Sequence, residues 1–308
     1  MYSSLKTRYL YAFMRSIVIG TRGSPIALSQ ARWVVSRLKE EWPDNEFRLH
    51  TVPNTGAVQG LRGSRVEALR SALLGEKIDI ALHHLRDLPV LPAPDLELAS
   101  IPRRLEARDA LIGRSGFKSL VNLPDGARLG VSSALRRALL RSYRPDLTLL
   151  ALTGDIDDRL EALGAGEFDA IILPAGDLQQ LDLRHRIDEI IAAEIILPAP
   201  AQGAMALEVR VDDDIATEVA YTLQHRPSDD RVTAERAFMD GLKSQSALVG
   251  ALATLNDGIL SLEGCVAAAD GSQVIRASIE GDADEAEDLG LELAQDVLAR
   301  GGAALLKS

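Results

Sequence analysis

From residue 16 onward, short apolar runs alternate with stretches in which apolar residues recur three or four positions apart. The run Ile17-Val18-Ile19 reads as a strand, and Ser24-Pro25 follows it after a short loop. Ser suits the N-cap of a helix and Pro its first position. The predicted helix has one apolar face, made of Ala27, Leu28, Ala31, Val34, Val35 and Leu38. Strands that alternate with helices are typical of a mainly parallel α/β sheet.

The first α/β unit continues with a predicted helix over residues 65–74 and a strand over residues 78–82. The stretch from Val90 to Pro102 is rich in proline and reads as irregular. Residues 197–203 read as a crossing back into this unit, and residues 205–209 as one of its strands.

A second α/β unit lies between these segments. Its predicted strands cover residues 128–131, 147–152 and 169–173. Ser132 or Ser133 is placed to cap the helix after the first of these strands, and Asp155 the helix after the second.

The pattern changes after residue 225. A predicted helix over residues 229–242 precedes strand-like runs at 248–255, 259–268 and 273–280. Asn256-Asp257-Gly258 and Asp270-Gly271 separate these runs and are strong hairpin signals. A last amphipathic helix over residues 283–300 completes a small α+β domain. We therefore predict an N-terminal extension (1–15), domain 1 (16–105 plus 200–224), domain 2 (106–199) and domain 3 (225–308).

Composition narrows the class of protein. The 308 residues carry a net charge of −11, which argues against nucleic acid as a partner. No apolar run reaches the roughly 18 residues needed to span a membrane. The single cysteine excludes an intramolecular disulfide framework and fits a reducing compartment, so we expect a cytoplasmic protein. Residues 1–39 hold no acidic side chain; we expect Met14 to be the true start, with a transit peptide as the alternative.

Five arginines fall at predicted strand ends or in the first turns of helices. Guanidinium groups bind carboxylates and phosphates through paired hydrogen bonds, and helix N-termini also favour anions. The set predicts a pocket for a polyanionic small molecule; the alternative is that each arginine is a solvated surface residue. Its members are Arg22, Arg86, Arg136, Arg137 and Arg159.

Asp87 is the best candidate for chemistry. It follows a predicted strand and lies close in sequence to Arg86, His84 and His83. A carboxyl group in a partly dry cleft can exchange a proton with an amine and stabilise a developing cation. The alternative is a turn residue with local hydrogen bonds. The sequence offers no second Cys/His cluster to complete a metal site, so we expect no metal.

The sequence resembles the porphobilinogen deaminase (hydroxymethylbilane synthase) family in motifs that follow the family's order from residue 16 to the C-terminal domain. The resemblance implies two periplasmic-binding-protein-like α/β domains plus a small C-terminal α+β domain. It also implies a dipyrromethane primer and a substrate with several carboxylates. The matching segments are Ile19 to Leu28, Ile78 to Pro89, Ile101 to Leu111, Ser132 to Arg137, Gly154 to Leu160, Glu167 to Leu173, Pro200 to Ala204 and Ala234 to Phe238.

By this resemblance, Asp87 would aid the loss of ammonia from porphobilinogen and stabilise the resulting azafulvenium-like cation. The third domain would carry the primer near Ser246. We expect a monomer with a small-molecule ligand and no nucleic-acid or membrane partner. The implied ligands of substrate and primer carboxylates are Arg22, Ser24, Arg62, Arg86, Ser132, Ser133, Arg136, Arg137 and Arg159.

The chain departs from the family at the primer anchor. Ser246 or Gln245 stands where the family has its cysteine, and Cys265 lies in a strand-like run elsewhere and reads as a small buried hydrophobe. A serine hydroxyl without a base is a poor nucleophile beside a thiolate. Two functions stay open at this point: an enzyme that deaminates and condenses porphobilinogen, or a diverged relative that binds a pyrrole or other polycarboxylate without polymerising it. A solute receptor is a third possibility, which we do not favour because we expect no secretion signal.

Overall fold

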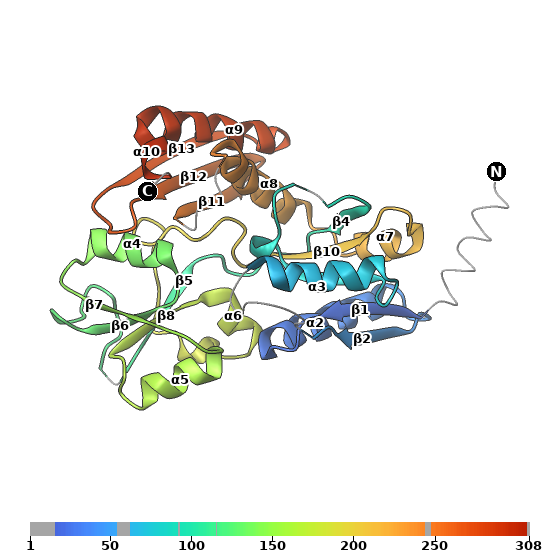
Figure 1. Ribbon diagram of the computed structural model, residues 1–308, viewed down its shortest axis with the longest axis horizontal. Coiled ribbons are helices and arrows are strands. Elements are labelled where there is room, and N and C mark those ends of the chain that lie inside the picture. Colours follow the sequence, from blue (N-terminus) through green and yellow to red (C-terminus); the bar gives the residue numbers. More distant parts are fainter. Residues whose placement is uncertain (1–15, 54–61, 92, 115, 244–247, 307–308) are drawn as a thin grey trace. The chain divides into compact units, whose positions relative to one another are not determined.

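The computed structural model describes residues 16–53, 62–91, 93–114, 116–243 and 248–306 (Figure 1). The predicted extension 1–15 and the candidate anchors Gln245 and Ser246 lie outside these ranges. The chain forms two compact units, one from residues 1–104 and 204–229, the other from residues 105–203 and 230–308. Within the described ranges, no helix is long and apolar enough to cross a membrane.

The first unit is built on a five-stranded sheet with the order β2-β1-β3-β10-β4. Strand β1 pairs in parallel with β2 and β3, whereas β10 runs antiparallel to both β3 and β4. The sheet is therefore mixed rather than mainly parallel, because the strand that returns late in the chain runs against its neighbours. The strands are β1 (Ile17–Thr21), β2 (Phe47–Thr51), β3 (Ile80–His84), β4 (Leu96–Ser100) and β10 (Met205–Arg210).

Helix α2 (Pro25–Glu41) begins where its sequence predicts. Pro25 occupies the first turn, and the Ser24 hydroxyl accepts a hydrogen bond from the backbone N–H of Ala27. Its predicted apolar face is buried at Ala31 and Leu38 against the strands of the sheet. The other helices of this unit are α3 (Arg62–Leu74) and α7 (Asp214–Tyr221).

Two predictions for the first unit are wrong in detail. The strand predicted over residues 78–82 begins and ends two residues too early, since β3 runs through His84, and both histidines are buried polar side chains. The predicted irregular stretch 90–102 contains β4, an edge strand between prolines. Proline is tolerated at the ends of edge strands, so the Pro-rich flanks hide a strand of five residues.

The second unit contains a five-stranded sheet with the order β7-β6-β8-β5-β9. Its parallel pairs are β6 with β7 and β6 with β8, and β5 runs antiparallel to β8 and β9. The sequence pattern predicts neither β5 (Asp109–Gly113) nor β9 (Glu189–Ile190). The remaining strands are β6 (Arg128–Val131), β7 (Thr148–Ala151) and β8 (Ala170–Pro174), and the helices are α4 (Ala134–Tyr143), α5 (Ile156–Gly164) and α6 (Ala175–Gln180).

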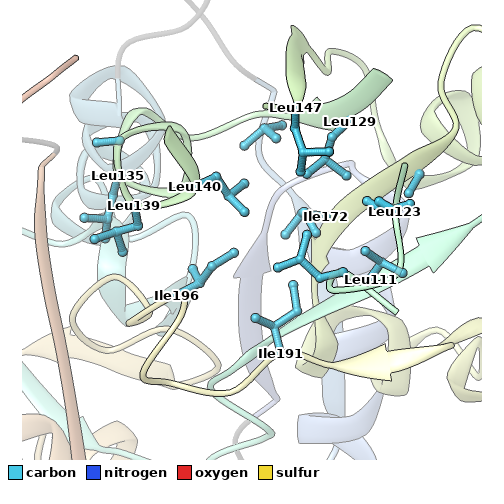
Figure 2. Close-up of a cluster of buried hydrophobic side chains, with 14 of the residues drawn as sticks. Leu111, Leu123, Leu129, Leu135, Leu139, Leu140, Leu147, Ile172, Ile191 and Ile196 are labelled. Carbon is cyan, nitrogen blue, oxygen red and sulfur yellow. The ribbon is translucent and has the colours of Figure 1, made fainter. Parts of the chain in front are cut away.

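Helix α4 packs its apolar face on this sheet (Figure 2). Leu140 points from α4 toward Leu129 and Ile172, and all three are buried in one cluster. Because this face is fixed in the core, the polar first turn of α4 remains at the end of β6, where the sequence places its candidate ligands.

The second unit also contains the three-stranded antiparallel sheet β11-β12-β13. The predicted hairpin turn between β11 and β12 is confirmed: Asp257 and Gly258 both have positive φ, at 50° and 84°. The elements are β11 (Val249–Asn256), β12 (Ile259–Ala267), β13 (Val274–Asp282), α8 (Arg226–Gly241), α9 (Ala286–Val297) and α10 (Ala303–Leu305). The predicted fold class, two α/β sheets followed by a small α+β sheet, is confirmed.

Candidate functional site

Asp87 and Arg22 come together at one edge of the first sheet. Strand β1 ends one residue before Arg22, and parallel β3 ends just before the 3-10 turn Leu85–Asp87. Parallel neighbours place their carboxyl ends at the same edge, where open α/β sheets bind ligands. The guanidinium Nη2 of Arg22 lies 3.9 Å from Oδ2 of Asp87. Both side chains remain partly accessible, at 22% and 14%.

The turn that carries Asp87 is anchored by its flanking residues. Leu85 and Leu88 are buried, and the N–H of Leu85 donates to the carbonyl of Ala204 at 3.0 Å. The N–H of Leu88 donates back to the carbonyl of Leu85 at 3.1 Å. Because the two leucines are fixed in the core, Arg86 and Asp87 between them stay half-buried at the surface of the unit. The carboxyl group is thus presented on a rigid turn.

The core of the same unit holds a buried ionic cluster, which we call the Arg70–Glu208–His83 cluster. Arg70 of α3 donates Nε and Nη2 to the Glu208 carboxylate of β10, at 3.0 and 2.8 Å to Oε1. Nε2 of His83 lies 3.1 Å from the other oxygen, Oε2. Burial alone would raise the pKa of Glu208, but the neighbouring His83 and the hydrogen bonds from Arg70 outweigh it and lower this pKa. His83 therefore faces a carboxylate in the core and ties β3 to β10.

His83 and His84 belong to no candidate metal site among the described residues. Among the described residues, no group of three or more His, Cys, Asp or Glu side chains is placed to hold a metal ion. Of two other predicted ligands of this unit, Ser24 is described in full and Arg62 only by its backbone. Ser24 caps α2 and lies two residues after Arg22, and Arg62 begins α3 with a side chain outside the described set.

In the second unit, the predicted serines and arginines surround the first turn of α4. Ser133 is the N-cap, and its hydroxyl accepts from the N–H of Arg136 at 3.3 Å. The side chain of Arg136 turns inward and makes a bidentate ion pair with Asp109 of β5, with contacts of 2.6 and 2.7 Å. Its Nη1 donates to the hydroxyl of Ser132 at 3.3 Å.

Arg137 differs from its neighbour. It is half-buried, and its guanidinium makes no hydrogen bond or ion pair with the part of the chain that the structure describes. Arg159 lies in α5, whose start is fixed by a capping box between Asp155 and Asp158. Nε of Arg159 donates to the carbonyl of Gly154 at 3.0 Å.

Asp109 and Gln202 are functional candidates that the sequence reasoning missed. The amide of Gln202 donates to Asp109 Oδ1 and to the carbonyl of Ala107, both at 2.7 Å. Gln202 also accepts from Nη2 of Arg136 at 3.2 Å. The sequence does contain one signal: Asp109 begins an apolar run that forms a buried strand. A carboxylate in such a run requires a cationic partner, and this would have pointed to a buried ion pair.

The thiol of Cys265 lies in the core of the second unit. Cys265 has no exposed surface, and burial raises its pKa to about 11. A Cβ atom added at Gly250 on the neighbouring strand would lie 2.9 Å from its Sγ, so the packing there is close. The prediction of a small buried hydrophobe is confirmed, and this thiol cannot anchor a ligand without opening the core.

Comparisons with known proteins agree along nearly the whole chain. The family model described as "Porphobilinogen deaminase, dipyromethane cofactor binding domain" matches residues 17–218, and the one described as "Porphobilinogen deaminase, C-terminal domain" matches residues 230–299. Porphobilinogen deaminase from Deinococcus radiodurans is 52% identical over 306 residues, 96% of this chain and 99% of that protein. The protein of that name from Thermus thermophilus is 50% identical over 298 residues, 95% of this chain and 99% of its own length.

A solved structure, a putative methionine-binding lipoprotein from Bacillus subtilis, aligns with 68% of this chain and 90% of its own, at a TM-score of 0.42 and 12% identity. The two family models together span both units, and the relatives match over nearly their full lengths. This chain belongs to the porphobilinogen deaminase family.

Proposed function

We propose that this protein is a hydroxymethylbilane synthase-type transferase that deaminates porphobilinogen and condenses it into a linear tetrapyrrole. The observation that carries the proposal is the rigid turn that presents Asp87 beside Arg22 at the carboxyl edge of the first sheet. This turn lies within the segment, residues 17–218, that matches the family's cofactor-binding domain.

Asp87 is assigned the acid–base and cation-stabilising role. In the deamination step, the substrate's aminomethyl group reacts in its protonated, ammonium form: its C–N bond breaks and neutral ammonia leaves with the bonding electron pair. The positive charge that remains on the pyrrole is stabilised by the adjacent carboxylate of Asp87. When the new C–C bond forms, the attacking pyrrole carbon loses a proton, which the same carboxylate can accept.

Within each unit, carboxylate binding is assigned to the cationic groups at the edge of that unit's own sheet. Arg22 lies beside Asp87 in the first unit, and Arg137 and Arg159 lie at the starts of α4 and α5 in the second. Guanidinium groups are suited to carboxylate binding because their planar donors match the two oxygens. We also propose as carboxylate ligands Arg86, Ser24, Ser132, Ser133 and Arg62. The structure does not describe the side chain of Arg62.

The polar groups of the second unit fit the family's dipyrromethane cofactor, which carries carboxylate side chains. Arg137 has a guanidinium without a partner among the described residues, and the exposed Ser132 lies close to it in the chain. When bound, the cofactor supplies the primer to which pyrrole units are joined. Cys265 does not fit the anchoring role, because its thiol is buried and its pKa is raised. Any covalent anchor must therefore be another residue, with Ser246 and Gln245 at the position of the family cysteine.

We further infer a cytoplasmic monomer. The single cysteine is a buried thiol, which fits a reducing compartment. Size-exclusion chromatography with light scattering tests the monomer: a mass near 33.2 kDa supports it, and twice that mass contradicts it.

The test is turnover of porphobilinogen by the purified full chain and by Asp87→Asn. We expect the wild type to consume the substrate and form a linear tetrapyrrole. Asp87→Asn keeps the shape of the side chain but removes its charge, so kcat should fall at least about 100-fold. Asp44→Asn, the same change at an exposed position, is the matched control and should stay within about twofold of wild type.

Intact-mass spectra before and after incubation separate the two ways of holding the primer. An adduct of two or more pyrrole units means that a covalent primer forms, and peptide mapping then locates it. Substrate consumption with an unchanged mass means turnover on a primer held without a covalent bond. An unchanged mass with intact substrate contradicts the proposed function and favours a protein that only binds a polycarboxylate.

A further inference from the structure

The pair Arg136 and Asp109 in the second unit is almost fully enclosed. The side chain of Asp109 has no exposed surface, and that of Arg136 is 7% exposed. Gln202, which contacts both, is 2% exposed. We call these residues the Asp109–Arg136–Gln202 cluster. Because a buried charge is costly unless it is paired and hydrogen-bonded, the internal contacts of this cluster decide what it can do.

Both oxygens of Asp109 are used inside the cluster. Oδ2 accepts from Nε of Arg136 at 2.6 Å, and Oδ1 accepts from Nη2 of Arg136 and from Nε2 of Gln202, each at 2.7 Å. The pairing is bidentate, so it occupies the Nε–Nη2 edge, two donors that could otherwise bind a ligand carboxylate. The charges of Asp109 and Arg136 cancel each other.

Gln202 fixes the orientation of this pair. Its amide nitrogen must face Asp109 and the carbonyl of Ala107, and its amide oxygen then accepts from Arg136 at 3.2 Å. The remaining nitrogen of Arg136, Nη1, lies 3.3 Å from the Ser132 hydroxyl. The cluster therefore holds the hydroxyl of Ser132 and the first turn of α4 in one arrangement.

Arg137 follows Arg136 in α4 and has the opposite properties. Its side chain is half-buried, and no acceptor among the described residues engages its guanidinium. A cation in this state lacks the internal carboxylate that its neighbour has, so it is available to an external one.

We propose that Asp109 and Gln202 are positioning residues that hold Arg136 and, through it, Ser132, whereas Arg137 supplies the guanidinium that binds a ligand carboxylate. This inference rests on the proposed function and deepens it, because the resemblance to the family assigns carboxylate binding to both arginines alike. The two arginines thus have different roles, since Arg136 organises the protein and Arg137 contacts the ligand.

Three variants of α4 test the role of Arg137, and one of them is a control. Each is measured for KM and kcat with porphobilinogen and for melting temperature with and without this ligand. Arg137→Gln should leave the ligand-free melting temperature unchanged, raise KM at least about tenfold and reduce the ligand-induced shift. Arg137→Lys keeps the positive charge and should recover part of the lost affinity. Arg141→Gln, at the exposed end of the same helix, is the control and should leave KM within about twofold.

Gln202→Leu tests positioning. It leaves Oδ1 of Asp109 and the carbonyl of Ala107 with fewer donors, so the ligand-free melting temperature should fall. A purely structural loss would reduce the amount of folded enzyme, which lowers apparent kcat and leaves KM unchanged. If Gln202 instead positions Ser132, the molecules that do fold should have a KM several-fold higher than wild type. Their kcat per folded molecule should stay near the wild-type value.

The inference is overturned if Arg137→Gln changes neither KM nor the ligand-induced shift, or if Gln202→Leu lowers stability with KM unaltered. It is also overturned if Arg136→Lys raises KM without lowering the ligand-free melting temperature, since Arg136 would then bind the ligand itself. A wild type that is stabilised by porphobilinogen but does not consume it contradicts the proposed function alone, because the binding comparison between Arg137→Gln and wild type still stands.

Discussion

The thiol of Cys265 and the carboxyl group of Asp87 show opposite outcomes of burial for reactive side chains. Cys265 is enclosed on β12, where desolvation disfavours the thiolate. Asp87 is half-buried on a turn anchored by the leucines on either side of the Arg86–Asp87 pair. A side chain can act on a ligand only when its charged form is stable and its surface is reachable. Asp87 meets the criterion of a reachable surface, whereas Cys265 meets neither criterion.

We therefore predict that Cys265 resists alkylation in the native protein. At about pH 8, near the pKa of a free thiol, iodoacetamide should leave the native intact mass unchanged and add one carbamidomethyl group in denaturant. Cys265→Ala should retain porphobilinogen consumption within about twofold, because the thiol does not reach the substrate. Rapid labelling of the native chain, or loss of a covalent primer in Cys265→Ala, would show that the core opens at this strand.

At the scale of elements, helix starts are the most predictable features. Ser24, Ser133 and Asp155 fall at predicted cap positions, and each accepts a hydrogen bond from a backbone N–H of the turn that follows. A cap acts within three residues, so the sequence contains all of its information. The sequence pattern misses strands such as β2, β4 and β9 because they are short or form sheet edges, where pairing with distant segments decides the structure.

The attachment of α3 to β10 depends on the Arg70–Glu208–His83 cluster. We predict that Arg70→Met lowers the free energy of unfolding by about 3–5 kcal/mol, since among the described residues it leaves a buried carboxylate with only the imidazole of His83 as partner. Arg37→Met, which breaks an exposed ion pair with Glu40, is the control and should cost less than about 1 kcal/mol. Urea unfolding monitored by circular dichroism measures both. Equal losses in the two variants would mean that the buried cluster contributes no more than a surface pair.

At the scale of the whole molecule, the two large sheets share one plan. Each has a parallel core of three strands and two further strands joined by antiparallel pairing, in the equivalent orders β2-β1-β3-β10-β4 and β7-β6-β8-β5-β9. The alternating pattern predicts the parallel part, because strand, helix and strand follow one another in sequence. The antiparallel strands β10 and β5 are contributed from outside this alternation, and β5 carries Asp109.

The candidate site likewise has one part that the sequence predicts and one part that only the fold shows. The sequence predicts Arg22 and Asp87 at one sheet edge because both follow strands of the same unit, and their side chains lie 3.9 Å apart. The contact between Asp109 and Gln202 joins residues 93 positions apart, and that between Arg136 and Gln202 joins residues 66 positions apart. No local period encodes such contacts, so only the folded structure distinguishes an arginine that is paired internally from one that is not.

The carboxylate of Glu208 makes the stability of the fold depend on pH. The pKa of Glu208 is lowered in the folded protein from the ordinary value of 4.5, because His83 and Arg70 stabilise its ionised form. A lowered native pKa means that the unfolded chain binds a proton at a higher pH than the native chain does. The contribution is therefore complete above about pH 4.5 and is lost as the pH falls through the native pKa.

Glu208→Gln removes this proton-binding site from both states and should be less stable than wild type at neutral pH. Its unfolding free energy should fall less steeply than that of wild type between about pH 5 and about pH 3. Glu40→Gln, which removes an exposed carboxylate, should keep the wild-type slope, because a surface ion pair shifts stability little. Urea titrations at a series of pH values give both slopes. If Glu208→Gln and wild type lose stability in parallel, the acid sensitivity resides in other carboxylates, of which Asp169 with its lowered pKa is the next to replace.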